Sequence, residues 1–240
     1  MHFAISRRIV ATLLAVVAVA LSSGCASTQS RVANGARDAG EVVRGSVVLI
    51  QPDIELSEIT AGGIQQPRAD WTARARAELP VALQRQLALG AAIRLATFEI
   101  ANDLPASART RQLLHLHRAV GFSILRHGYG VGRLPSKGQR FDWTLGPGVA
   151  ALRTATGADY ALFVTVRDSY TSGGRAALMV VGALVGVGLS GGVQSGFASL
   201  VDLRDGHVVW FNTLVDHNGD LRDAEGAETA ARQLLDGFPS

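Results

Sequence analysis

The sequence predicts an α/β (α+β) domain in which helices pack on a mixed sheet of about five strands. It also predicts a C-terminal β-hairpin and an N-terminal lipoprotein signal. Segments rich in β-branched residues alternate with segments whose apolar residues recur every three or four positions. Two alternating apolar runs flank Asp205-Gly206, a dipeptide typical of tight hairpins. Strands that alternate with helices, combined with an antiparallel hairpin, favour this architecture.

The composition permits one well-packed domain. Of the 240 residues, 48% are hydrophobic and 18% charged, which excludes a chain that is disordered throughout. A single cysteine excludes a disulfide scaffold and a cysteine-rich zinc site. Without Arg7 and Arg8, 21 basic residues face 20 acidic ones. The basic residues are also spread along the chain, so we expect no nucleic-acid partner.

The N-terminus indicates export. Arg7-Arg8 give a positive start, and residues 9–21 form an apolar run without charge. Small residues follow, as in a secretory signal peptide, which we assign to residues 1–24. The apolar run is too short to cross a bilayer as a helix.

The only cysteine follows these small residues. The segment before Cys25 resembles the lipobox of bacterial lipoproteins, with Ser22 where leucine is usual. The resemblance implies that Cys25 carries a diacylglycerol and anchors the mature chain in membrane lipid. Ala26 in place of aspartate implies the outer membrane, with the domain facing the periplasm. The alternative is an ordinary secreted protein with an incidental cysteine.

After the anchor we expect a tether and then one domain. Residues 26–46 are small and polar, so residues 25–46 are predicted to be a flexible tether that begins with the lipidated cysteine. Residues 47–240 are predicted to be a single αβ periplasmic domain with an apolar, glycine-rich insert at 173–196.

The first half of the domain predicts two strands and a helix between them. Residues 47–56 are β-branched and apolar, although Pro52 limits pairing there. Asp70 is the expected N-cap of the helix, Pro80 its expected kink and Gly90 its expected end. Its apolar residues recur at spacing four: Trp71, Ala75, Leu79, Leu83 and Leu87. Residues 93–100 read as the second strand.

Two further helices and a strand follow. Residues 107–127 predict a helix capped by Gly128, with an apolar stripe formed by Leu113, Leu116, Val120 and Ile124. Residues 128–142 predict an exposed loop. Gly146-Pro147 opens a short helix that ends at Gly157. Residues 159–168 predict a long apolar strand.

The C-terminal part predicts the hairpin and a last helix. A two-residue loop at Asp205-Gly206 would place six apolar residues on one face, paired as Leu203 with Val208, Val201 with Trp210, and Phe197 with Leu214. Leu200 and Phe211 would lie on the other face, which we expect to be partly covered. Residues 223–235 predict the helix, with Ala227, Ala231, Leu234 and Phe238 on one side.

The insert at 173–196 is the least ordinary feature. Residues 176–189 carry no charge, yet they are too few for a helical membrane span. Its glycines include two four-residue spacings that permit close helix contact: Gly182, Gly186, Gly192 and Gly196. Three interpretations remain open: a segment buried inside the domain, a membrane-touching or pore-lining hairpin, and a self-association surface.

Several patterns suggest chemistry only weakly. Gly188 to Gly192 fit G-x-S-x-G around Ser190, but a nucleophile elbow needs a helix where we expect a strand. Gly186 to Gly191 fit G-x-G-x-x-G without the strand–helix setting of a dinucleotide site. The histidines do not have metal-ligand spacing: His115 and His117 share a helix but not a face, with His117 in the core or at its boundary, while His207 and His217 flank the hairpin. We therefore expect no catalytic residue, no cofactor and no metal site.

Two motifs resemble bacterial envelope lipoproteins. Gly157-Ala158-Asp159-Tyr160 enters a strand, and the hairpin carries Val201-Asp202-Leu203 and then Val208-Val209-Trp210. This pattern, within residues 149–237, is similar to the curli secretion channel lipoprotein and to smaller lipoproteins with a related αβ periplasmic domain. The resemblance implies a non-enzymatic role in building, stabilising or regulating an envelope assembly.

These observations favour a non-enzymatic outer-membrane lipoprotein that binds or assembles envelope proteins, with a homo-oligomer among the expected assemblies. The glycine-rich insert is the expected association segment. The alternatives are a periplasmic ligand-binding module that uses the loop from Gly128 to Arg140, and a serine hydrolase that uses Ser190.

Overall fold

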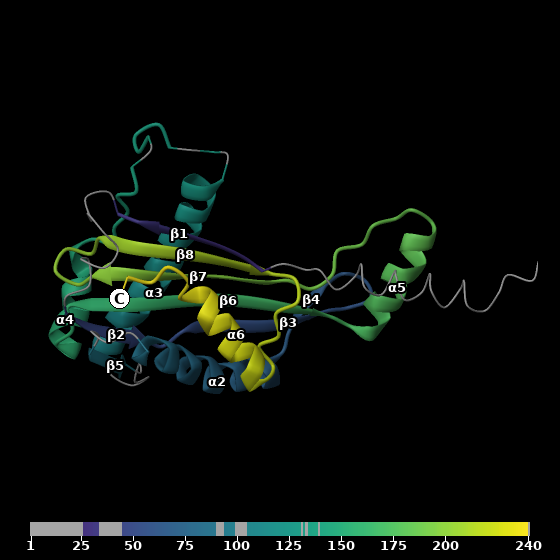
Figure 1. The fold of residues 1–240 in the computed structure, drawn as a ribbon, viewed down its shortest axis with the longest axis horizontal. Helices are drawn as coiled ribbons and strands as arrows, with labels where there is room; N and C mark the ends of the chain where they lie inside the picture. Colours follow the sequence, from purple (N-terminus) through teal and green to yellow (C-terminus); the bar gives the residue numbers. More distant parts are fainter. Residues whose placement is uncertain are drawn as a thin grey trace, which may run out of the picture.

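The computed structural model describes residues 26–33, 45–89, 94–98, 105–130, 132, 134–138 and 140–239. The signal peptide predicted for residues 1–24 and the lipidation site Cys25 lie outside this part. Within it, eight strands form one mixed sheet in the order β1-β8-β7-β6-β2-β5, with β3 beside β6 and β4 beside β3 (Figure 1). The strands are β1 (Ser27–Val32), β2 (Ser46–Ile50), β3 (Asp53–Ile59), β4 (Gln65–Pro67), β5 (Arg94–Phe98), β6 (Tyr160–Thr171), β7 (Gln194–Asp202) and β8 (Val208–Asp216).

The fold class is as predicted, but the sheet has more than the five strands expected. The strand predicted at 47–56 is two strands, because the chain breaks at Gln51-Pro52, where proline has no N–H to donate to a ladder. Both halves run parallel to β6, with Leu49 opposite Leu162 and Asp53 opposite Thr165. From Leu49 to Asp53 the chain advances by four residues, whereas β6 advances by three, from Leu162 to Thr165. The register against β6 therefore shifts by one residue at the break.

The first strand corrects the prediction of a flexible tether at 25–46. Residues Ser27–Val32 form β1, which pairs antiparallel with β8 along the edge of the sheet. Its sequence, STQSRV, has no apolar alternation, so nothing in its composition marks it as a strand. An edge strand that leaves side chains in solvent can be this polar.

Five α-helices and two short helical turns accompany the sheet in the described residues. They are α2 (Ala69–Ala88), α3 (Pro105–Ile124) with a π-helical turn at Leu125–Tyr129, a 3₁₀ turn at Pro147–Val149 that leads into α4 (Ala150–Thr156), α5 (Gly173–Leu184) and α6 (Ala224–Leu234). Two predicted caps are wrong: Arg68 occupies the N-cap position of α2 in place of Asp70, and the chain stays helical through Gly128. Two ends follow prediction, because Gly157 closes α4 with φ 68° and Asp223 accepts a bond from the Gly226 N–H.

Helices cover both faces of the sheet. One core joins α2 and α6 to Leu200, Trp210 and Leu214. The other joins α3, α4 and the loop after α3 to Phe163 and Phe211. In the described residues, no helix combines the length and apolarity that crossing a bilayer requires.

The stripe predicted on α3 is partly wrong. Leu116 is 41% exposed, whereas His117 and Gly121 face the sheet together with Leu113 and Ile124. A Cβ on Gly121 would come within 2.1 Å of the Phe197 ring, so a glycine is needed where the helix approaches the sheet this closely. Because the buried stripe includes a histidine and a glycine, its helical spacing is not visible as a repeat of apolar residues in the sequence.

The hairpin is present, but its predicted register is wrong. The turn is longer than two residues, and a bulge lies between Leu200 and Val201, so that Val201 pairs with Val208 and Leu200 with Trp210. The six residues expected on one face are therefore divided: Trp210 and Leu214 face α2 and α6, while Phe197, Val201, Leu203 and Val208 face α3. The expected cover on both faces is confirmed.

Candidate functional site

The insert forms an arm that projects from one end of the sheet. The arm, residues 173–193, leaves β6 after Thr171 and returns at Gln194, the first residue of β7. Its helix α5 is capped by Ser172, whose hydroxyl accepts a hydrogen bond from the Arg175 N–H at 3.2 Å. Figure 1 shows α5 standing beyond the strands, away from the two helical layers.

The arm exposes large apolar side chains along the outer side of its helix α5 and in the turn that follows. Leu184 is 83% exposed and Val185 is 71% exposed. Within the 12-residue helix α5, Gly182 is the only buried residue. Four more large apolar residues of the arm are exposed: Leu178, Val180, Val181 and Val187.

The exposure of these side chains is unusual for an apolar helix. A helix that is apolar on all sides is normally buried, and a contiguous exposed apolar surface of this kind marks an interaction site. The interpretation of the insert as buried within the domain is therefore wrong. The membrane-facing and self-association interpretations remain.

The four glycines singled out from the sequence lie in different settings. Gly182 is in α5, where a Cβ would come 2.8 Å from the carbonyl oxygen of Val187. Gly186 turns the chain after the helix with φ 77°. Gly192 and Gly196 lie against the neighbouring strand, where a Cβ would approach the carbonyl oxygens of Ser169 and Thr165 to 2.0 and 2.7 Å.

These glycines allow the chain to turn after α5 and to pack closely against β6 where it returns to the sheet. They do not line one face of a helix. The side chains available for contact are the exposed Leu and Val residues, which the glycine spacing does not indicate. The signal that could have found them is the absence of any polar face in residues 176–189.

A buried polar network fixes the base of the arm. The Asp168 carboxylate accepts three hydrogen bonds at one oxygen, from the Tyr170 hydroxyl at 2.5 Å, the Gln194 amide at 2.9 Å and the Leu221 N–H at 3.3 Å. Burial raises the pKa of Asp168 above the ordinary carboxyl value. The network joins the last part of β6, the start of β7 and the segment after β8, so both ends of the arm are held.

Ser190 does not have the setting of a nucleophile. It lies exposed in the irregular return of the arm, and its carbonyl oxygen accepts a bond from Arg175 at 3.2 Å. The next element is strand β7, whereas a nucleophile elbow places a helix there. The G-x-G-x-x-G pattern at Gly186 to Gly191 is also followed by a strand, so it lacks the geometry of a dinucleotide site.

The histidines do not form a catalytic or metal site in the described residues, where no three His, Cys, Asp or Glu side chains could hold a metal ion. His117 lies in the core, as predicted, with its Nε2 2.6 Å from the Ser199 hydroxyl and its ring stacked on Phe163. Burial lowers the pKa of His117 to about 3, so the ring is neutral. His207 lies at the hairpin turn, where its backbone N–H donates to the Asp205 carboxylate at 3.0 Å.

The loop expected to bind a ligand offers little space in its described part. Phe141 and Trp143 are buried in the core beneath α3 and anchor the end of the loop. The recess between His127, Lys137 and Arg140 has a volume of about 10 Å³, which is roughly the space of one water molecule.

Comparison with known proteins yields a structural likeness alone. No protein-family model and no curated protein matches the chain. The fold is similar to that of the PelC dodecamer from Paraburkholderia phytofirmans, with a TM-score of 0.39, 15% sequence identity, and cover of 90% of this chain and 99% of the solved chain. A point variant of the same protein gives a TM-score of 0.40 at 12% identity with the same cover. The dodecamer is a property of those proteins.

Proposed function

We propose that the chain is a non-enzymatic lipoprotein of the outer membrane that assembles with other copies of itself, and through them with envelope proteins. Cys25 carries the lipid, the domain faces the periplasm, and the arm is the surface of assembly. The observation that carries the proposal is the exposed apolar helix α5 on a rigid base.

The position of β1, which begins two residues after Cys25, supports this arrangement. Ser27, two residues after Cys25, pairs with Val215, which pairs with Ser195, which in turn lies opposite Arg167. That row crosses the sheet at the end from which the arm projects. An acyl chain on Cys25 therefore orients every copy with its arm toward the membrane surface.

Shared orientation favours contact between copies. Lipoproteins that are confined to one surface with their arms at one height meet at a high effective concentration. Contact between two arms removes Leu and Val side chains from water, at about 25 cal/mol per Å² of apolar surface buried. The exposed alanines of α5, Ala176, Ala177 and Ala183, are small enough to let two helices approach closely.

The test is the mass of the full-length, lipidated protein in mild detergent, measured by light scattering. We expect a discrete multiple of the chain mass. Leu184→Glu should raise the protein concentration at which the assembly forms by at least tenfold, because a carboxylate buried without a partner costs several kcal/mol. Leu89→Glu is the matched control, because Leu89 is 79% exposed and follows α2, outside the arm.

Two results would contradict the proposal. A wild-type monomer would show that the arm does not join copies. If Leu184→Glu then also lowered retention on lipid vesicles, the arm would be assigned to the bilayer surface, because α5 is only about 18 Å long, shorter than the bilayer core. An equal effect of Leu184→Glu and Leu89→Glu would show that the arm has no special role.

A further inference from the structure

A groove lies on the α3 face of the sheet, near the end from which the arm projects. Its volume is about 80 Å³, and it opens between the end of α3 and the strands β6, β7 and β8. By the same measure one water molecule takes roughly 10–15 Å³, and a methylene group is of similar size. The groove therefore has room for a short stretch of hydrocarbon.

Two large apolar side chains of the groove reach the surface. Phe122 of α3 is 52% exposed, although its ring lies edge-on against the buried ring of Phe197 at 5.7 Å. Val215 of β8 also lines the groove and is 41% exposed. Because both flank one groove, they form a small apolar surface in water, which is typical of a contact site.

Short side chains keep the groove open. Residues that are paired across strands, or lie two apart along a strand, point to the same face of the sheet. Phe197 packs in the core beneath α3, so its paired neighbours face α3 as well. Two rows of paired residues line the groove: Thr165 with Phe197 and Thr213, and Arg167 with Ser195 and Val215.

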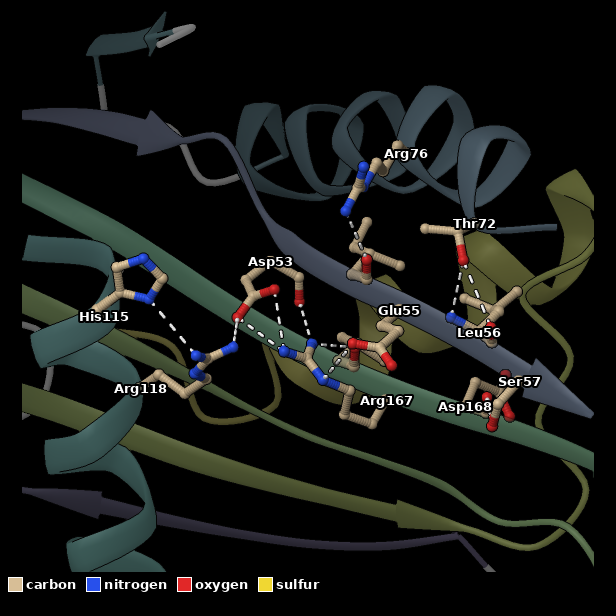
Figure 2. Close-up of polar contacts among 12 residues, drawn as sticks. Asp53, Glu55, Leu56, Ser57, Thr72, Arg76, His115, Arg118, Arg167 and Asp168 are labelled. Atoms are coloured by element: carbon tan, nitrogen blue, oxygen red, sulfur yellow. Dashed lines mark hydrogen bonds and ion pairs between the residues drawn. The ribbon is translucent and has the colours of Figure 1, made fainter. Parts of the chain in front are cut away.

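Of the described residues that line the groove, only Arg167 is charged, and its charge is directed elsewhere. Arg167 donates to the Asp53 carboxylate at 2.9 and 3.0 Å. Figure 2 shows its guanidinium turned toward Asp53 on β3, which lies on the side of β6 opposite to β7. The groove therefore meets the hydrocarbon stem of Arg167. Asp53 also lines a separate cavity of about 270 Å³ between α2 and α3.

The start of β1 lies beside this groove. Ser27 pairs with Val215, which lines it. Arg31 of the same strand lies on the α3 face, where its guanidinium is 5.3 Å from the centre of the Tyr129 ring. Because side chains alternate along a strand, Ser27 faces the same side as Arg31. Cys25 precedes Ser27 by two residues, a step of about 7 Å in an extended chain.

We propose that the groove binds the first part of one acyl chain of the lipid on Cys25. The inference rests on the proposed function, because it requires a lipidated Cys25. An extended chain that continues β1 backwards directs the Cys25 side chain toward the α3 face, beside Val215. Contact with Phe122 and Val215 removes hydrocarbon from water, which favours the bound chain about fourfold for each methylene group buried.

The groove covers only part of one chain, so the remainder of the lipid continues into the bilayer. Binding next to the anchor fixes the orientation of the domain on the membrane, which the lipid alone would leave free.

The test is photo-cross-linking of the full-length protein, purified from the envelope in mild detergent. Phe122→p-benzoylphenylalanine places in the groove a probe that joins to C–H bonds on illumination. Trypsin then releases residues 25–31, with the lipid on Cys25, and residues 119–126, with the probe. We expect the two peptides to be joined through an acyl chain, in protein that migrates as a single chain on a denaturing gel. Leu116→p-benzoylphenylalanine is the matched control, because Leu116 is 41% exposed on the same helix outside the groove, and it should not give this product.

A variant that fills the groove tests whether the product depends on the groove. With the probe at position 122, Ser195→Leu should lower the yield of joined peptides at least about fourfold, the change expected when one methylene group is displaced. Ser123→Leu makes the same substitution on α3 outside the lining, so it should leave the yield unchanged.

The remaining outcomes would each overturn the proposal. If residues 25–31 carried no lipid, the anchor at Cys25 would be wrong, and this inference with it. If they carried lipid but gave no joined peptides, or equal amounts from positions 116 and 122, the groove would not hold the chain and the anchor would stand. A product in a band of two chains would assign the groove to the lipid of a neighbouring copy. A product with detergent or free phospholipid alone would assign it to bulk lipid.

Discussion

At the scale of single residues, His117 shows how burial fixes a protonation state. It lies between α3 and the sheet, next to Ser199 and the ring of Phe163. Loss of hydration disfavours the charged ring, and this effect exceeds the opposing influence of Asp53, so the pKa falls to about 3. The histidine thus contributes packing and one hydrogen bond, without a charge, at neutral pH.

This state makes the stability of the fold depend on pH. The unfolded chain binds a proton on His117 near pH 6.5, whereas the folded chain does not until about pH 3. The neutral His117 therefore costs no stability above pH 6.5, and the unfolding free energy falls as the pH drops from 6.5 toward 3, by about 1.4 kcal/mol per pH unit. In urea unfolding between pH 7 and 4.5, His117→Gln should reduce the slope of the unfolding free energy against pH by that amount. A slope equal to that of the wild type would contradict a neutral, buried His117.

The sequence could identify some residues and not others. It placed His117 in the core, and it found the insert through its lack of charge. The cavity beside Asp53 could not be found from the sequence, because its lining comes from β3, α2 and α3, which are brought together only when the sheet and the two helices assemble. The exposed Leu and Val residues of the arm were not predicted, because the spacing of the glycines is the more familiar sequence signal.

At the scale of elements, the base of the arm depends on one carboxylate. Asp168→Ala would leave the Tyr170 hydroxyl and the Gln194 amide without their shared acceptor, at a cost of about 3 kcal/mol in unfolding free energy. The Leu221 N–H would keep the Tyr170 oxygen as its acceptor, at 2.7 Å. Asp168→Asn keeps an acceptor oxygen and should cost about 1 kcal/mol. Urea unfolding of the two variants measures the difference.

The same pair tests whether the network positions the arm. Asp168→Ala should also speed proteolytic cleavage within residues 173–193, because the root of the arm loosens, and Asp168→Asn should not. Equal unfolding free energies for the two variants would show that the hydrogen bonds contribute nothing beyond the packing of the side chain.

Elements with strong local signals follow the sequence, and elements set by long-range pairing do not. The last helix matches its predicted range because a cap and an apolar period mark it. The polar strand β1 and the short strand β4 exist because a neighbouring strand edge supplies their hydrogen bonds. The register of the hairpin depends on the bulge between Leu200 and Val201, for which the alternating pattern contains no signal.

At the scale of the whole molecule, the arm stands at one end of the sheet, apart from the two helical layers (Figure 1). One end presents the apolar arm beside the start of β1, where the proposed lipid anchor joins the domain (Figure 1). Because the buried network around Asp168 holds both ends of the arm, contact between arms in the proposed assembly requires no change inside the domain.

The most direct test of assembly through the arm is cross-linking in the intact envelope. The chain has one cysteine, whose thiol is consumed by lipidation in this account, so Val181→Cys supplies a single reactive thiol on the arm. Val181 is 57% exposed, and Leu89→Cys supplies a matched thiol outside the arm. With a short bismaleimide, we expect a cross-linked pair of chains for Val181→Cys and a single chain for Leu89→Cys. A single chain for both variants, with both proteins lipidated and located in the outer membrane, would contradict assembly through the arm.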